Sequence, residues 1–510
     1  MQDADVIVIG SGLGGLVAGA MLAYYGKSVL VCESHTLPGG AAHGFQRQGF
    51  TFDSGPSFFC GLSDRQSLNP LRQVLDVLGE TVPAIPYDPL GHYHFDDVTV
   101  PIHGDFAAYQ AAIAQVTPTG AAELGRLNSQ MLGLYRALSE IPTLALRSDF
   151  NLIQLLIGYP GALLKLLPQL GKINGSFGDL VDAVVTDPWV RRLLDVECFL
   201  LSGLGAADTV APEMAFMFGE RAKSVVDYPL GGSEAIVHAL VRGLEKHGGQ
   251  LRLGTHVDRI QIQQNQVTGV TLRNGEELRA PVVIANATLW DTYTKLIEPE
   301  QLPRSCQQQV QQTQPIHSFM HLHLGIRAAG LDDLTIHHVV VRDGDLTQPG
   351  QTCMISIPSV LDPSLAPDGY HTIHAYTLEP WAGWQRDAGY GDRKRQRAER
   401  LYQALERVIP DVRSRVEVEL IGTPLTHARF LRRHQGTYGP AIPADQGLFP
   451  SCHTPIRGLY RVGDSTIPGI GVPAVAASGL LCANTLVSPH VHRDMITQWA
   501  SGHSMATSSR

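Results

Sequence analysis

The chain has 510 residues, 44% of them hydrophobic and 17% charged, with a formal net charge of −9. This length exceeds one ordinary hydrophobic core, so we expect two domains or one elaborated domain. The acidic balance argues against nucleic acid as a partner. Seven cysteines are scattered without a C-x-x-C pair, which indicates reduced thiols in a cytosolic-type compartment, with burial as the expected role of each.

The N-terminus and the hydropathy pattern bear on location. Asp3 and Asp5 precede the first strand without a basic segment, so we expect neither a signal peptide nor a transit peptide. No window reaches the roughly 18 uninterrupted apolar residues that a spanning helix needs. We therefore expect a protein of the cytoplasmic side without a transmembrane helix.

The stretch from Asp5 to Gly40 predicts a βαβ unit, and its glycines fit the spacing G-x-G-x-x-G directly after strand Val6–Ile9. Gly10 makes the tight turn, Gly12 admits a pyrophosphate, and Gly15 lets the helix lie close to the strand. Phosphate charge is then favoured at the helix N-terminus, whose N–H groups lack partners. The pattern indicates an adenine dinucleotide site, the alternative being a purely structural βαβ unit.

Glu33 ends the second strand of this unit, 18 positions after the last glycine of the motif. A carboxylate there can accept hydrogen bonds from ribose hydroxyls, and it disfavours the 2′-phosphate of NADP.

The following segment narrows the cofactor. Ser34 and the double glycine Gly39-Gly40 come after Glu33, and Phe52-Asp53-Ser54-Gly55-Pro56 lies downstream. This order resembles the N-terminus of the FAD-dependent phytoene desaturase and carotenoid isomerase family, within the amine oxidase-like flavoproteins. The resemblance implies FAD, with the double glycine against its flavin side. Many phytoene desaturases carry arginine next, whereas Ala41-Ala42 here is more similar to the isomerase branch.

Further along the chain, short strands and turns are expected to about residue 97, with a hairpin at Tyr87–Asp97. Between about 105 and 212, apolar residues at three- and four-residue spacing predict helices at Ala121–Ile141 and Phe177–Leu200. The apolar stretch Leu152–Leu170 has two interpretations. It is either a pair of buried helices broken at Pro160, or a patch that dips into a bilayer and makes peripheral membrane contact.

A glycine-rich entry at 228–233 precedes a helix predicted over Glu234–His247. Three strands are then predicted over Leu251–Ile262, Gln266–Leu272 and Glu277–Ala285, with Asn274-Gly275 as a hairpin turn between the last two. The end of the third strand, Pro281–Ala285, is expected in buried parallel sheet. The family resemblance implies that Val257 pairs with the adenine through its backbone.

From about 288 to 424 the pattern predicts a sheet and a helix, which we interpret as the floor and wall of a substrate cavity. The helix is Gly391–Val408, and its basic cluster near Arg393 to Arg397 favours a solvated face over lipid binding. The strands are predicted at Ser318–Ile326, Ile336–Arg342, Cys353–Ser359 and His371–Thr377.

Histidines recur in pairs, His92 with His94, His321 with His323, and His337-His338. A metal site needs a third ligand, which the sequence does not supply. We therefore predict solvated or packed histidines and no metal.

The segment from Gly458 to Gly479 closes the predicted site. A strand ends in Gly463-Asp464, a Gly/Pro loop follows, and a small-residue helix has Pro473 in its first turn. Asp464 can hold a ribityl hydroxyl, and the helix N–H groups near Gly471 can stabilise negative charge at the flavin N1–C2=O edge. The loop differs from that of many isomerases, which leaves the closest activity open.

No catalytic side chain is assigned, and Arg432 and His434 are expected to be structural. The predicted cofactor-binding residues are Gly10, Gly12, Leu13, Gly14, Gly15, Glu33, Ser34, Gly39, Gly40, Ala41, Ala42, Gly55, Val257, Gly463, Asp464, Gly471, Val472 and Pro473.

The fold class expected is α/β, a Rossmann-type FAD-binding domain with an interleaved α+β substrate domain and a helical insertion. The FAD-binding domain would comprise residues 1–104, 212–287 and 425–488. The insertion would cover 105–211, the substrate domain 288–424, and a frayed tail 489–510.

The resemblance implies an enzyme that isomerises or desaturates a carotenoid or a related isoprenoid polyene with FAD. A desaturase would pass electrons to a quinone or to oxygen. Two alternatives stay open: a flavin-dependent oxidase or saturase of another apolar molecule, such as a retinoid or an amine, and a non-catalytic escort of prenyl lipids.

Overall fold

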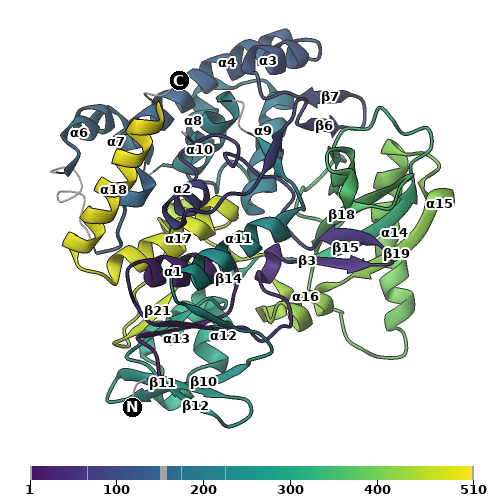
Figure 1. The fold of residues 1–510 in the computed structure, drawn as a ribbon. Helices are drawn as coiled ribbons and strands as arrows, with labels where there is room; N and C mark the ends of the chain where they lie inside the picture. The colour runs from purple at the N-terminus through teal and green to yellow at the C-terminus, as the bar shows by residue number, and fades with distance from the viewer. Residues whose placement is uncertain (1–2, 66, 150–157, 174, 224–225, 508–510) are drawn as a thin grey trace.

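The computed structural model describes residues 3–65, 67–149, 158–173, 175–223 and 226–507. A five-stranded parallel sheet, of which Figure 1 labels β21 in the lower half of the view, has the strand order β21-β13-β1-β2-β9. Its central strands are uninterrupted runs of buried apolar residues, as a sheet covered on both faces requires. The predicted buried parallel strand is confirmed, and so is the Rossmann-type fold. The strands are β1 (Val6–Ile9), β2 (Val29–Cys32), β9 (Gln250–Arg252), β13 (Val282–Ala285) and β21 (Leu459–Arg461).

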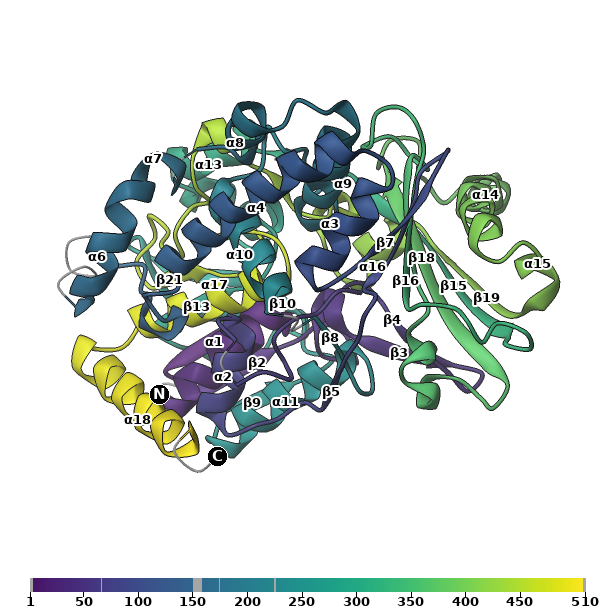
Figure 2. The ribbon, with the colours of Figure 1, turned by 90° about the horizontal axis from the view of Figure 1, so that it is seen from above.

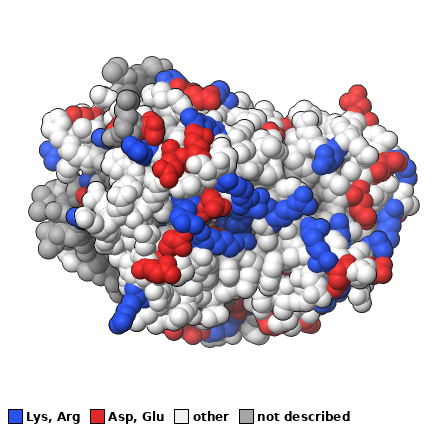
Figure 3. Space-filling view, turned by 90° about the horizontal axis from the view of Figure 1, so that it is seen from below, with Lys and Arg blue, Asp and Glu red and all other residues white. Residues whose placement is uncertain are grey.

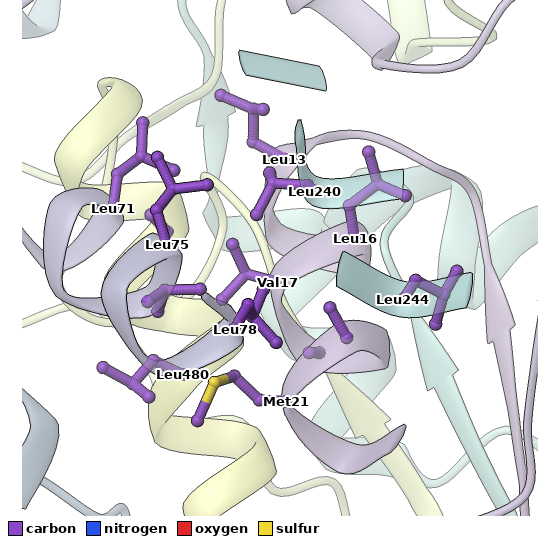
Figure 4. Packing of buried hydrophobic residues seen from close by; sticks show 14 of the residues in the cluster. Leu13, Leu16, Val17, Met21, Leu71, Leu75, Leu78, Leu240, Leu244 and Leu480 are labelled. Carbon is purple, nitrogen blue, oxygen red and sulfur yellow. The ribbon is translucent and has the colours of Figure 1, made fainter. Parts of the chain in front are cut away.

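Leucine-rich helices pack together beside this sheet, and Figure 4 shows their interlocking side chains. Helix α1 lies at the centre of this cluster, buried on nearly all sides because its residues are small or apolar. The helices are α1 (Leu13–Tyr24), α2 (Pro70–Leu78), α11 (Ser233–Lys246) and α17 (Val472–Thr485).

Helices α1 and α17 touch through their backbones. A Cβ atom added to Gly479 would lie 2.3 Å from the carbonyl oxygen of Gly14, closer than any real side chain tolerates. Glycine therefore permits this approach, and the N-terminal ends of both helices reach one side of the domain.

The predicted strand Leu251–Ile262 is wrong as a single element. Strand β9 joins the parallel sheet, whereas β10 begins an antiparallel sheet with β11 and β12. Gly254 lies between them with φ of +62°, a turn that glycine adopts readily. Glu277–Ala285 is likewise divided at Pro281, and the Asn274-Gly275 hairpin joins β11 to β12 as predicted. The small sheet consists of β10 (Val257–Gln263), β11 (Gln266–Leu272) and β12 (Glu277–Arg279).

The helical insertion has its own apolar core. The predicted helix Phe177–Leu200 is two helices, because Asp187 caps the second one and Pro188 occupies its first turn. The helices are α3 (Phe106–Ala114), α4 (Pro118–Leu138), α6 (Pro160–Leu166), α7 (Leu170–Ile173), α8 (Phe177–Val184), α9 (Pro188–Ser202) and α10 (Ala211–Ala222).

Part of the apolar stretch at 152–170 lies outside the described residues, which resume at 158. Helix α6 begins at Pro160, the predicted break, and buries Ala162 and Leu166 while Leu164 is 76% exposed. Across the described ranges, no helix is both long and apolar enough to cross a bilayer.

A seven-stranded sheet forms the substrate side, in the order β19-β15-β18-β17-β16-β6-β7. The predicted strands of this region are confirmed, and the hairpin β6-β7 adds to their edge. Helices α14 (Tyr390–Val408) and α15 (Val412–Arg415) cover the outer face (Figure 2). The strands are β6 (Gly91–His94), β7 (Thr99–Ile102), β15 (Ser318–Arg327), β16 (His337–Val341), β17 (Thr352–Ser356), β18 (Tyr370–Glu379) and β19 (Val416–Gly422).

Strand alternation decides which residues of this sheet face inward. In β15, Met320, Leu322 and Leu324 pack against α14. Phe319, His321 and His323 point to the opposite face.

The basic residues of α14 have acidic partners. Arg393 pairs with Asp387 at 2.9 Å, and Arg397 lies 3.5 Å from Glu379. Figure 3 shows positive and negative side chains mixed over the face seen from below. This arrangement supports the solvated-face interpretation of the cluster.

The prediction of a frayed tail is wrong for most of its length. Helix α18 spans Pro489–Thr507, and Met495 is 3% exposed in the leucine-rich core. His492 also points inward, with its Nε2 2.7 Å from the carbonyl oxygen of Leu144. Inward-facing residues at helical spacing, hidden within a polar composition, explain why the sequence suggested disorder.

We predict that Gly479→Ala destabilises the protein, because the new methyl group would push α17 away from the Gly14 carbonyl. Overpacking of this kind costs about 1–3 kcal/mol, measurable as a lower urea midpoint. The matched control is Gly133→Ala on α4, where an added Cβ meets no atom within 4 Å. It should leave the midpoint unchanged or raise it, since alanine favours helix; equal effects of the two changes would contradict the prediction.

Candidate functional site

A cavity of about 1340 Å³ joins the nucleotide-type domain to the helical insertion and the seven-stranded sheet. Every predicted cofactor-binding residue except Gly15 lines it. Gly15 instead lies against the turn, where an added Cβ would be 2.3 Å from the Gly10 carbonyl oxygen. This position matches the packing role expected of the third glycine. The assignment of these residues to cofactor binding stays a prediction.

The N-terminus of α1 lines one part of the cavity. Gly12 is the N-cap, the first turn carries no acidic residue, and its N–H groups have no partners within the helix. Gly10 has φ of +93°, so the tight turn uses a glycine conformation. A Cβ on Gly12 would lie 2.5 Å from Nδ2 of Asn286. Asn286 thus shapes this cradle, a role that a lone asparagine after a strand did not reveal.

Glu33 is held in place for hydrogen bonding. Its carboxylate accepts hydrogen bonds from the Ser11 backbone N–H and hydroxyl, both at 2.8 Å, and from the His35 N–H at 2.7 Å. The side chain is buried yet lines the cavity. Ser11 was missed, although it lies inside the glycine motif. The Ser34 hydroxyl also donates to this carboxylate, at 3.3 Å, so a ribose hydroxyl would replace that long contact.

The N-terminus of α17 reaches the opposite part of the cavity. Gly471 caps the helix with φ of +104°, and no acid lies in its first turn. Asp464 pairs with Arg433 and accepts a hydrogen bond from the Ser465 hydroxyl at 3.0 Å. Arg433 therefore fixes this carboxylate, whereas the sequence had singled out its neighbours.

Those neighbours differ in position. Arg432 lines the cavity. His434 stacks on Trp290 with ring centroids 5.1 Å apart, and its backbone N–H donates to Asp291 at 2.7 Å. The structural role expected of His434 agrees with these contacts.

Beyond the α17 end, the cavity becomes an apolar arm. We use this name for the part lined by α9 and α10 residues such as Leu200, Phe216 and Met217, together with Tyr438. Phe319 packs edge-on against Tyr438 at 5.1 Å, and the Tyr438 hydroxyl donates to the Leu201 carbonyl oxygen at 3.0 Å. The arm thus offers a long apolar surface with few free polar groups.

The inward face of the sheet carries stacked histidines. His374 on β18 joins His321 and His323, and one ring nitrogen of each lies within 4.8 Å of the others. The sequence could not supply this third residue, because strand pairing brings it from 51 positions beyond His323. However, the rings are nearly parallel, and His321 Nδ1 is 2.6 Å from His374 Nε2.

That separation is a hydrogen bond between two imidazoles. Two nitrogens bound to one tetrahedral zinc at about 2.0–2.1 Å would be separated by more than about 3 Å. The arrangement is a hydrogen-bonded stack, and the absence of a metal stays a prediction.

Burial keeps these histidines neutral. It lowers the pKa of His323 to about 4 and that of His427 to about 3, and it lowers the pKa values of His321 and His374 strongly. The inward face is therefore uncharged at neutral pH, which suits an apolar ligand.

Residues 13–487 match the model of the flavin containing amine oxidoreductases. Prolycopene isomerase 2 (chloroplastic) of an Oncidium hybrid cultivar is 35% identical over 96% of this chain and 84% of its own length. The neurosporene-forming phytoene desaturase of Rhodobacter capsulatus is 26% identical over 94% of this chain and 93% of its own. A solved structure of putrescine oxidase is similar at a TM-score of 0.62 with 16% identity, covering 98% and 99% of the two chains.

We predict that acid destabilises the fold through the buried histidines. His323 has a pKa of about 4 in the folded chain and about 6.5 when unfolded, so below pH 6.5 only the unfolded chain takes up its proton. Stability should fall as pH drops from about 6.5 to 4, by up to about 1.4 kcal/mol per pH unit for each such group. Urea midpoints across this range measure the slope.

The test variant is His323→Gln, whose amide can still donate to the Asp53 carbonyl oxygen that His323 contacts at 3.1 Å. It should flatten the slope. The control His238→Gln removes a side chain that is 51% exposed and should leave the slope unchanged. Equal slopes in all three proteins would exclude this cause.

Proposed function

Because this chain belongs to the family of flavin-containing amine oxidoreductases, we propose that it is an FAD-dependent enzyme that isomerises a carotenoid or related isoprenoid polyene. The observation that carries the proposal is the single cavity, which joins a dinucleotide cradle to an apolar arm. Pockets for drug-sized ligands measure about 300–1,000 Å³, so the volume near 1340 Å³ suits a cofactor and a substrate together.

FAD fits the residues present. Glycines at 12 and 14 leave a cradle that a Cβ would fill, since the added atom would lie 2.5 Å from Asn286 or 3.0 Å from the Gly463 nitrogen. The first turn of α1 would hold the pyrophosphate, Glu33 the ribose, and Asp464 a ribityl hydroxyl. When bound and reduced, FAD would supply an electron-rich flavin ring beside the polyene.

The residues of the arm bind and orient the substrate. A polyene has no polar handle, so shape and apolar contact must align it, and Phe319 and Tyr438 offer flat surfaces for its conjugated chain. His321, the member of the neutral histidine stack that lines the cavity, adds surface without charge. Closing this arm to water favours the apolar substrate over solvent.

Two observations favour isomerisation over desaturation. The relatives at about 35% identity are named prolycopene isomerases, whereas the named desaturases reach 26%. Ala41-Ala42 also follows the double glycine where many desaturases have arginine. Isomerisation consumes no net electrons, so this function would need no external electron acceptor.

Peripheral membrane contact through α6 and Leu167, the residue directly after it, forms part of the proposal. Leu164 is 76% and Leu167 is 53% exposed, whereas Leu166 is buried and lines the cavity. Exposed leucines beside a cavity-lining segment would let a membrane-dissolved polyene enter without crossing water. Lys165 lies next to them, paired with Glu140 at 2.5 Å.

We predict that the purified protein is yellow and that its reduced form converts prolycopene to a trans isomer of unchanged mass. Anaerobic incubation with reduced or oxidised flavin, followed by chromatography and mass spectrometry, measures this. Phytoene serves as the second substrate. Loss of two hydrogens with oxidised flavin, and electron transfer to a quinone or to oxygen, would make it a desaturase. A colourless protein that extracts prenyl lipids would be an escort instead.

We predict that Leu164→Asp with Leu167→Asp lowers flotation with liposomes at least tenfold. Each exposed leucine inserted into the bilayer contributes about 1.5–3 kcal/mol, and about 1.4 kcal/mol is a factor of ten. Leu253→Asp is the matched control, since Leu253 is 41% exposed after β9, outside the helical insertion. Unchanged flotation of the double variant would exclude membrane contact at α6.

A further inference from the structure

Glu213 places a carboxyl group without a partner in the wall of the apolar arm. It lies in the first turn of α10 and lines the cavity near Phe216 and Met217. Among the described residues, none makes a hydrogen bond or an ion pair with its carboxyl oxygens. A carboxyl in such surroundings normally finds a partner or lies in water.

The other carboxylates in the described lining of this cavity all have partners. Glu197 accepts from the Tyr109 hydroxyl at 2.9 Å and pairs with Arg221 at 2.8 Å. Glu220 accepts from the Ser67 hydroxyl at 2.6 Å. The remaining ones are Glu33, Asp258, Asp291 and Asp464, each bonded to a hydroxyl, an N–H group or a basic side chain.

Two opposing influences leave both protonation states of Glu213 accessible. Burial in the apolar wall raises its pKa to about 7, since it disfavours the charged form. The N–H groups at the start of α10 favour the carboxylate once it forms.

Few titratable groups act on this carboxyl. The two titratable groups whose charge interacts with that of Glu213 are Cys198 on α9 and Tyr438. Burial raises the pKa of both, so both are neutral near pH 7. Burial alone accounts for the shift of Glu213, so the described residues of α4, α7 and α8 packed against α10 add no resolved charge effect.

We propose that Glu213 is a catalytic acid and base, which gives a proton to a carbon of the bound polyene and takes it back after rotation. This inference rests on the proposed function and deepens it. It assigns the chemistry to the arm's own wall, at a residue that the glycine motifs and the family resemblance did not indicate.

The step balances without an oxidant or a reductant. The O–H bond of the carboxyl breaks, and the π pair of one C=C bond forms the new C–H bond. Positive charge then spreads over the remaining conjugated carbons, and the former double bond rotates as a single bond. The carboxylate removes the proton, and the returning electron pair restores the C=C bond in its new geometry.

Other groups that line the arm are poor acids at neutral pH. Burial keeps His321 and His427 neutral, so neither carries an imidazolium proton to give. The Tyr438 hydroxyl is committed to the Leu201 carbonyl oxygen at 3.0 Å, and burial raises its pKa.

The test compares Glu213→Gln and Glu213→Asp in the flavin-loaded protein. General acid–base catalysis contributes about 10²–10⁴-fold, so Glu213→Gln should lower kcat by that factor while flavin content and polyene binding, read from absorption spectra, stay intact. Glu213→Asp should restore part of the rate. In the wild type, kcat should fall as pH rises through about 7, because the protonated acid is lost. The residual rate of Glu213→Gln should not fall as pH rises through about 7.

The control is Glu245→Gln on the exposed side of α11, which should keep both the rate and its fall above about pH 7. The inference would be overturned, and the proposed function would stand, if the wild type is active and Glu213→Gln is equally active. The same holds if the rate of Glu213→Gln still falls as pH rises through about 7. A wild type that isomerises no polyene in either flavin state would overturn the proposed function itself. Loss of flavin or of polyene binding in Glu213→Gln would show a structural role and also overturn the inference.

Discussion

The backbone contact between α1 and α17 is the constraint on which the site depends. Glycine at 479 lets the two helices meet, since a Cβ there would lie 2.3 Å from the Gly14 carbonyl oxygen. The contact brings two helix N-termini, 460 positions apart at Gly12 and Val472, to one cavity. Each end presents unpaired N–H groups, so one site can hold negative charge at two places along an extended cofactor. A side chain at 479 would therefore separate these two ends.

The rest of the cavity follows from strand alternation. In β15 and β18, alternate residues such as Leu322 and Ile373 pack on the side of α14, and Phe319, His321 and Tyr376 line the cavity. Burial removes the charge of His321. The cavity therefore changes from a hydrogen-bonding cradle to an apolar arm, within one fold and without a separate binding domain. An enzyme that brings a charged cofactor against a hydrocarbon needs both environments in direct contact.

The sequence predicted the parts of this site that local pattern controls. Gly10 to Glu33 and Gly463 to Pro473 carry their own turn and helix-start signals, and all the cofactor-binding residues predicted within them except Gly15 line the cavity. It could not predict what tertiary pairing supplies. His374 reaches His321 only through strand register, Asn286 becomes a cradle wall only beside Gly12, and Arg433 matters only because Asp464 faces it. Element boundaries failed where one residue decided them, at Gly254, Pro281 and Pro188. Helix α18 was missed because its few buried residues are diluted by polar ones.

A carboxyl without a partner costs stability, which makes Glu213 informative. Each of the other acidic side chains of the described lining has at least one partner, so this fold has the means to pair a carboxylate and does so repeatedly. At Glu213 the surroundings are instead apolar on the cavity side and electropositive at the helix start. In such an environment the protonated and the charged forms are both accessible near neutral pH. A salt bridge or open water would instead favour the charged form. A hydrocarbon substrate has no polar group to pair with a fixed charge. It can, however, exchange a proton with a carboxyl group whose protonated and charged forms are both accessible.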